Sequence, residues 1–346
     1  MGTQLNLRRV TLTILAGSLL WLGAVSSAQV TVDNDDIGGV VRGINGPEAG
    51  VWVIAESDSL DTVFRKIVVT DDQGRYVLPD MPDADYNVWV RGYGLKDSEP
   101  VSSKPGAALN LAAVQAADAR EAAQIYPANY WYSLIEVPPA SDFPGTGEAG
   151  NGISPGMRTQ ADWIDGLKQG CQLCHQLGNQ ATREIASLSE FETTKAAWAH
   201  RIKMGQRGGL MASFMQRFGA DHAIGKYAEW TDRIMAGEVP PMPPRPQGEE
   251  RNVVLTMWEW AGETGYVHDE IASDKRDPSV NAGGPIYGVD FANDKLVWVD
   301  PVTSIASEIK LPVRDVPGEG DFKSYIDQNN LEPSMVWGDE LIWNNP

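Results

Sequence analysis

Apolar and polar residues alternate along residues 37–112, and this alternation predicts short β-strands. The clearest runs are 51–55, 66–70 and 86–90, in which apolar side chains recur at every second position. Glycine, proline and aspartate separate the runs, as in the turn at 71–74. No segment with helical spacing interrupts them. The pattern therefore predicts an antiparallel β-sandwich over residues 37–112.

Helical spacing replaces the alternation within residues 157–266. Apolar side chains recur at intervals of three and four along 161–167 and along 249–261, as they do on one face of an α-helix. Residues 191–203 and 227–235 are two further candidate helices. The spacing predicts an all-α domain that begins and ends with a helix.

Residues 113–156 have the composition of a linker between these two domains. An alanine-rich start at 112–124 is followed by an aromatic patch at 126–132 and by a Pro/Gly-rich stretch at 138–155. The aromatic patch is compatible with a ligand platform. Side chains of this kind more often pack between neighbouring domains, and we expect that role here.

Strands return after residue 283, with candidate runs at 287–291, 295–300 and 307–311. Four side chains of this region recur 45 residues later: Asp294, Leu296, Trp298 and Pro301 match Asp339, Leu341, Trp343 and Pro346. The period is in the range of β-propeller blades, although two similar hairpins could coincide. Because a propeller needs about four to eight blades, residues 283–346 are expected to be incomplete propeller repeats of a longer protein.

The length and the charge limit the possible functions. The chain has 346 residues, more than the roughly 250–300 that one hydrophobic core supports, so two or three domains are expected. It has 28 Lys and Arg against 47 Asp and Glu, a net charge of −19. A protein without surplus positive charge is not expected to bind nucleic acid. The acidic surface is compatible with docking of a basic partner protein.

Residues 1–28 have the order of a secretory signal peptide. Arg8 and Arg9 precede the apolar run 10–25, and small residues lead to Ala28. The apolar run is short of the roughly 20 residues that a membrane-spanning helix needs, so we expect cleavage and not a retained anchor. No later segment is apolar enough to span a membrane. The protein is therefore expected in the periplasm or secreted, with a net charge of −21 after removal of the two arginines.

The two cysteines of the chain lie in one pentapeptide, Cys171-Gln172-Leu173-Cys174-His175. This spacing is that of covalent haem c attachment, since both thiols must reach the two vinyl groups on one porphyrin edge. The histidine that follows then serves as the proximal iron ligand. Cys171, Cys174 and His175 are thus predicted to hold one covalent haem c.

Three alternatives to haem attachment fit the pentapeptide less well. A thioredoxin-type dithiol needs a βαβ context, whereas these flanks are helical. A zinc site needs two more ligands at finger spacing, which His200 and His222 do not supply. A disulfide or a buried cysteine pair accounts for the cysteines and not for His175.

The sixth iron ligand must come from a methionine or a histidine. Met242 lies in Pro240-Pro241-Met242-Pro243-Pro244, where the prolines prevent helix formation and stiffen an extended loop that could aim the thioether at iron. Met242 is therefore the predicted ligand and Met235 its main rival. The weaker candidates are Met204, Met211, Met215, His200 and His222.

The residues around the pentapeptide resemble the class I cytochrome c family. Helices at 161–167 and 249–261 would cross over the haem, with Gly166 as the small residue at the crossing. In this family, a methionine in a proline-rich loop before the last helix is the distal ligand, which the resemblance assigns to Met242. It implies an all-α cytochrome c domain at 157–266.

Two further resemblances concern the flanking regions. The order Thr70-Asp71-x-x-Gly74-x-Tyr76 and then Leu78-Pro79-Asp80 resembles the carboxypeptidase regulatory-like (transthyretin-like) domain, which implies an accessory sandwich without catalysis of its own. Residues 287–291 onward are weakly similar to the first blade of virginiamycin B lyase-type and quinoprotein-type propellers. The predicted fold class is thus a multidomain chain: an all-β sandwich, an all-α cytochrome c domain and a partial β-propeller-like segment.

These features predict an exported mono-haem c-type cytochrome that transfers single electrons. A six-coordinate iron has no open position for a substrate, and the sequence contains no nucleophile constellation, carboxylate pair or phosphate loop. The partners would be redox proteins. The alternatives are an electron-exit module of a larger propeller dehydrogenase or lyase, and a sandwich that binds a carbohydrate or envelope polymer. Carboxylates at 33–36 and 71–72 are expected to be solvated, because they lack calcium-loop spacing.

Overall fold

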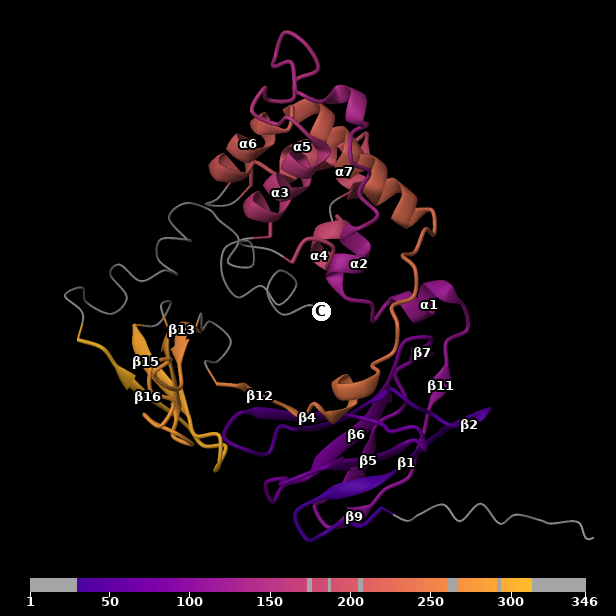
Figure 1. The fold of residues 1–346 in the computed structure, drawn as a ribbon, viewed down its shortest axis with the longest axis vertical. Helices are drawn as coiled ribbons and strands as arrows, with labels where there is room; N and C mark the ends of the chain where they lie inside the picture. The colour runs from indigo at the N-terminus through magenta and orange to yellow at the C-terminus, as the bar shows by residue number, and fades with distance from the viewer. Residues whose placement is uncertain are drawn as a thin grey trace, which may run out of the picture.

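The computed structural model describes residues 30–172, 176–185, 188–204, 208–260, 267–290 and 294–312. A β-sandwich lies at one end of the molecule and a helical unit at the other, with a small sheet beside the sandwich (Figure 1). The predicted signal peptide 1–28, Cys174, His175 and the second repeat at 339–346 lie outside the described residues. Within the described residues, no helix is long and apolar enough to cross a membrane.

One sheet of the sandwich has the strand order β12-β4-β3-β6-β8. Its strands are β3 (Trp52–Ser57), β4 (Val63–Val69), β6 (Tyr86–Arg91), β8 (Val101–Ser103) and β12 (Leu255–Glu259). Strands β3, β4 and β6 lie where the alternation predicts them. In β6 the residues Tyr86, Val88 and Val90 are buried and their neighbours are not, because successive side chains point to opposite faces of a sheet.

The second sheet is built around β1 (Ile37–Gly43). Its partners are β2 (Gly46–Pro47), β5 (Arg75–Leu78), β9 (Ala107–Ala108) and β10 (Leu111–Ala112), and a separate pair joins β7 (Leu95–Lys96) to β11 (Val114–Gln115). A shared core of Ile37, Val53, Phe64, Leu78 and Val88 lies between the sheets. Gly39 lets the crossing chain approach β1, since a Cβ there would lie 1.9 Å from the carbonyl oxygen of Leu109.

The helical unit comprises residues 119–235. Its elements are α1 (Ala119–Ala123), α2 (Ala128–Tyr132), η1 (Ala140–Asp142), α3 (Gln160–Gly170), α4 (Gln180–Arg183), η2 (Leu188–Glu190), α5 (Thr194–Arg201), α6 (Gly208–Arg217) and α7 (Ala220–Met235). Thr159 and Asp162 form a capping box that starts α3. Buried side chains recur at three- and four-residue intervals along α7, from Ala223 to Ile234, so α7 is the central helix of this core.

The aromatic patch at 126–132 belongs to the helical unit and not to a linker. Tyr126 and Trp131 are buried in the helical core. The Tyr126 ring also meets Tyr93 of the sandwich edge to face at 5.5 Å, and Tyr93 in turn meets Trp52 at 4.9 Å. Within the patch, Tyr126 therefore packs between the helical unit and the sandwich.

The predicted fold class is wrong, and the decisive segment is 249–261. It forms η3 (Gly248–Asn252) and strand β12 in place of the last cytochrome helix. β12 pairs antiparallel with β4, from Leu255 opposite Ile67 to Glu259 opposite Val63. The described residues are organised mostly as strands in several sheets, and an all-α cytochrome c domain over 157–266 is not found among them.

The reason is that the apolar residues of 249–261 also fit a strand. Trp258 points inward and meets Phe64 of β4 at 6.3 Å between ring centroids, while Leu255 and Met257 face outward and are exposed. The edge of β4 offers a row of backbone hydrogen bonds that an isolated helix cannot use. The helical unit is consequently an insertion between two strands of one sheet.

The small sheet is a four-stranded antiparallel meander. It contains β13 (Val267–Ile271), β14 (Ile286–Asp290), β15 (Lys295–Val299) and β16 (Ala306–Lys310). The last three strands lie at the positions of the predicted runs, and β13 was not predicted. Trp258 of β12 donates a hydrogen bond from Nε1 to Ser304 Oγ at 3.2 Å, which links the small sheet to the sandwich.

Candidate functional site

Cys171 lies directly after the last residue of α3. Its backbone N–H donates to the carbonyl of Leu167 at 2.8 Å, so the residue continues the helical hydrogen bonding. Its Sγ lies 3.6 Å from the hydroxyl of Tyr227 on α7, and the side chain is half-buried. The thiol is thus held at the end of a fixed helix, beside the central helix of the unit.

α3 packs against Phe214 of α6 and against Phe218, which follows α6. A Cβ on Gly166 would lie 3.0 Å from the Phe218 ring, and a Cβ on Gly170 would lie 3.1 Å from the Phe214 ring. The last residue of α3 therefore lies against Phe214 of α6, and Gly166 lies against the residue that follows α6. This packing sets the position from which Cys171 leaves α3.

The residues that follow the pentapeptide are also fixed. Gly178 has φ +104 and lies so close to α2 that a Cβ there would be 2.0 Å from the carbonyl oxygen of Ala128. Asn179 caps α4 by accepting from the N–H of Thr182 at 2.9 Å. The Thr182 hydroxyl in turn accepts from the N–H of Gly178 at 2.8 Å. The described residues on both sides of Cys174 and His175 are tied to the helical core.

Tyr227, which lies beside the Cys171 thiol, belongs to an aromatic cluster. The rings of Tyr227 and Trp198 are stacked 4.9 Å apart, and Trp230 lies 6.3 Å from Tyr227. Burial raises the pKa of Tyr227 well above its usual value, with a smaller contribution from Cys171. Burial also raises the pKa of Tyr132, again with a contribution from Cys171. Both phenols therefore keep their protons at neutral pH, and the thiol lies against the hydroxyl of one of them, Tyr227.

Two buried N–H donors near the pentapeptide have no acceptor among the described residues. They are Nε of Arg183 on α4 and Nε1 of Trp131 on α2. The Arg183 guanidinium lies 4.2 Å from the centre of the Trp131 ring. Sequence reasoning missed both residues, because neither belongs to a motif and their proximity depends on the packing of α2 against α4.

The structure does not bring Met242 to Cys171. The segment between α7 and η3 runs past α1 to the sandwich, while α3 ends on the other side of α2 and α4 (Figure 1). Met242 is 59% exposed, and its Sδ lies 3.4 Å from the position that a Cβ on Gly94 would take. Met235 is also exposed, at the end of α7.

The other candidate iron ligands lie on α5, α6 and α7, apart from Met204, which follows the end of α5. Met215 is buried in the helical core, and Met211, one turn earlier on α6, is partly buried against it. His200 on α5 packs against Phe191 at 5.1 Å. His222 on α7 has a buried Nε2 without a hydrogen-bond partner among the described residues. Met211 precedes Phe214 by one turn, and Phe214 packs on the residue before Cys171.

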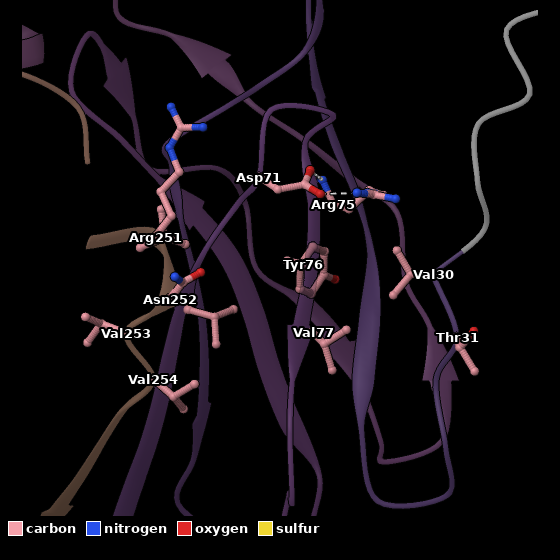
Figure 2. A pocket seen from close by; sticks show the side chains of 12 residues that line it. Val30, Thr31, Asp71, Arg75, Tyr76, Val77, Arg251, Asn252, Val253 and Val254 are labelled. Carbon is pink, nitrogen blue, oxygen red and sulfur yellow. Dashed lines mark hydrogen bonds and ion pairs between the residues drawn. The ribbon is translucent and has the colours of Figure 1, made fainter. Parts of the chain in front are cut away.

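Two further features of the sandwich have polar groups that could bind a ligand. Asp33, Asp35 and Asp36 bring carboxylate oxygens within 4.8 Å of one another, but they are partly or fully exposed and nothing else there indicates a cation. A groove of about 460 Å³ lies between β5 and the η3–β12 segment (Figure 2). Its Asp71 and Arg75 are paired with each other at 2.6 Å, so these charges are already satisfied.

Neither a protein-family model nor a curated protein matches this chain significantly.

Proposed function

We propose that this protein is a c-type cytochrome that transfers single electrons, with one haem attached covalently through Cys171 and Cys174. The observation that carries the proposal is the Cys-x-x-Cys-His pentapeptide, whose first cysteine leaves the end of a rigid helix with its thiol half-buried beside Tyr227. Both cysteines and the histidine are needed for haem attachment, and the chain has no other cysteines.

The described surroundings fit a porphyrin. A porphyrin is a flat apolar ring with two carboxylates, and it needs aromatic or aliphatic walls together with buried hydrogen-bond donors. Tyr227 lies beside the thiol, and Arg183 and Trp131 offer buried donors without acceptors among the described residues. When bound, the iron would supply a reversible one-electron change. The surrounding side chains would exclude water and thereby help to set the potential at which this occurs.

His175 is proposed as the proximal ligand because it follows Cys174 directly. For the sixth ligand, the packing favours Met211 over Met242. Met242 contacts the sandwich at Gly94, whereas Met211 lies one turn before Phe214, which contacts the last residue of α3.

We also propose export and a protein redox partner. The signal-like residues 1–28 and the acidic charge of −19 support an exported protein whose partner carries a complementary basic surface. Association with such a partner would slow as ionic strength rises, since salt screens the attraction between exposed charges.

Covalent haem is the direct test. The chain is produced together with a c-type cytochrome maturation system, denatured, and assayed for haem that stays with the polypeptide. We expect about one haem per chain, and its loss in Cys171→Ser and Cys174→Ser. A natively folded chain that carries no covalent haem under these conditions would contradict the proposal.

A further inference from the structure

Strand β12 lies at the edge of its sheet. In the order β12-β4-β3-β6-β8 it pairs with β4 alone, so the backbone groups on its other side have no strand partner among the described residues. A row of unpaired N–H and C=O groups is a template to which another strand can be added. The β12 edge is therefore open to pairing with a further chain.

The residues of this edge lack the features that usually prevent such pairing. Residues 253–258 read Val-Val-Leu-Thr-Met-Trp, without a charge, a proline or a glycine. The backbone is extended at Val253 and along β12. Edge strands avoid association through charged side chains, prolines or short length. In β12 a charge enters only at Glu259, the last residue of the strand.

Other edge strands of the molecule do have these protective features. At the opposite end of the same sheet, β8 is 3 residues long, with Pro100 before it and Lys104 and Pro105 after it. The outer strands of the small sheet are β13, which reads Val-His-Asp-Glu-Ile, and β16, which reads Ala-Ser-Glu-Ile-Lys. Each of them carries charged residues within the strand. The apolar edge of β12 thus differs from these three edges.

The exposed side chains along this edge form one apolar patch. Val253 is 56% exposed, Val254 48%, Leu255 48% and Met257 42%. Val253 and Val254 also line the groove beside β5 (Figure 2). Adjacent apolar side chains in water are unfavourable, and a patch of them marks a contact surface. The backbone edge and the patch therefore indicate the same kind of partner, an extended strand with apolar side chains.

The strand is complementary to a second copy of itself. In an antiparallel pairing centred on Leu255, this residue would lie opposite its own equivalent, and Met257 would lie opposite Val253. Glu259 at the end of β12 would face the end of η3 that carries Arg251 in the other copy, twice by symmetry. A two-fold axis brings the same patch of two chains together, as in most homodimers. Apolar residues would meet in the centre and opposite charges at both ends.

The net charge of −19 opposes the association of two copies. Around β12, however, the charges are balanced, since Glu259 forms an ion pair with Arg65 and Arg251 forms one with Asp72. Exposed charges more than about 8 Å apart are largely screened at physiological salt. A partner with the same net charge is therefore compatible with this edge.

We propose that β12 is the interface of a homodimer in which two copies of the chain pair antiparallel along this edge. The pairing joins the five-stranded sheets of the two copies into one continuous sheet. It supplies partners for the free backbone groups of β12 and covers Leu255 and Met257. The inference goes beyond electron transfer and requires no haem.

The test is the mass of the full chain in solution, measured by sedimentation velocity over a range of concentrations. The wild-type chain should form a dimer that dissociates on dilution. Leu255→Lys should raise the dissociation constant about tenfold or more, because it places two like charges opposite each other. Leu255→Glu should do the same. An equimolar mixture of these two variants should associate again, since opposite charges then meet across the axis.

Val101→Lys is the matched control. Val101 lies on β8, the edge strand at the other end of the sheet, and is 41% exposed, so its substitution should leave the dissociation constant unchanged. Circular dichroism checks that each variant folds. If either Leu255 variant does not fold, Met257→Lys mixed with Val253→Glu replaces the pair, because these two positions would also lie opposite each other.

Two results would overturn the homodimer. One is a wild-type chain that stays monomeric at every concentration, and the other is a dimer that persists unchanged in the charged variants of β12. A dimer that both charges disrupt and that mixing does not restore would overturn the symmetric pairing centred on Leu255. None of these results bears on covalent haem, so the proposed function is tested separately.

Discussion

Arg245 fastens the segment after α7 to the sandwich. Its Nε donates to the carbonyl of Tyr93 at 3.0 Å, and one Nη donates to Glu48 Oε2 at 2.7 Å. Glu48 is only 8% exposed, so its carboxylate depends on this cation. A single long side chain therefore helps to decide that the proline-rich segment returns to the sandwich.

Arg245→Ala should lower the free energy of unfolding by about 2–3 kcal/mol, because it leaves a buried carboxylate without its charged partner. Urea unfolding followed by circular dichroism measures the change. Lys104→Ala is the control, since Lys104 pairs with Asp85 at 3.1 Å but both side chains are exposed. It should change stability by less than about 1 kcal/mol. Equal effects of the two variants would show that the Arg245 contacts contribute no more than a surface pair.

Substitution can distinguish the two candidate methionine ligands, Met211 in the helical unit and Met242 against the sandwich. In haem-loaded protein, Met211→Ala should abolish the absorption that reports a methionine ligand on ferric iron, whereas Met242→Ala should preserve it. The reason is that Met211 shares α6 with Phe214, while Met242 lies against Gly94. The opposite result would assign the ligand to Met242, as the proline-rich sequence predicts.

At the scale of elements, β12 is the strand that distinguishes the observed fold from the fold predicted from the sequence. Successive β12 residues alternate between exposed and half-buried positions. Trp258 packs on Phe64 and bonds Ser304, while Met257 points outward. In the predicted helix, Val254, Met257 and Trp258 would all have shared one buried face.

Trp258→Ala should therefore destabilise the protein by about 2 kcal/mol, somewhat less than a fully buried tryptophan because the ring is only half-buried. Met257→Ala should change stability by less than about 0.5 kcal/mol. Thermal and urea unfolding of the two variants measure the difference. Similar losses in both would favour a helical face at 249–261 over the strand.

At the scale of the whole molecule, burial of tyrosines makes stability depend on pH. Burial raises the pKa of Tyr76 and Tyr86 above the usual value of 10.0. Above pH 10, the unfolded chain loses these protons and the folded chain retains them, so stability must fall as pH rises. Lys66 acts in the opposite direction, since burial lowers its pKa from 10.5. Burying the charged Lys66 side chain lowers the stability of the folded protein. This loss becomes smaller as pH rises and is absent above about pH 10.5.

We expect the free energy of unfolding to decrease above about pH 10 by roughly 1.4 kcal/mol per pH unit for each such tyrosine. Tyr76→Phe should reduce that slope by about one such increment, even though it also removes the hydrogen bond from Tyr76 Oη to the carbonyl of Leu109. Urea unfolding at pH 8, 10 and 11 provides the comparison. A variant with the wild-type slope would mean that Tyr76 does not retain its proton in the folded protein.

The contiguous strands and the start of α3 were the predictable part of the fold. The alternation of apolar and polar residues predicted β3, β4 and β6 correctly, because its period of two depends only on neighbouring residues. Thr159 and Asp162 are a local capping signal. The sandwich role of 249–261 was not predictable, since its partner β4 is almost two hundred residues earlier in the chain. The spacing of its apolar residues suited either structure.

The sequence by itself determined which residues the proposed haem attachment depends on. Cys171, Cys174 and His175 are adjacent in the chain, so their spacing needs no tertiary contact to be recognised. Only the tertiary structure decided what surrounds that chemistry. Arg183 and Trp131 meet because α4 packs on α2, and Met242 lies on the sandwich because the chain returns there to pair β12 with β4. Residues that are far apart in the chain form these contacts together, through close packing and through pairing at one sheet edge. The spacing of neighbouring residues therefore cannot predict them.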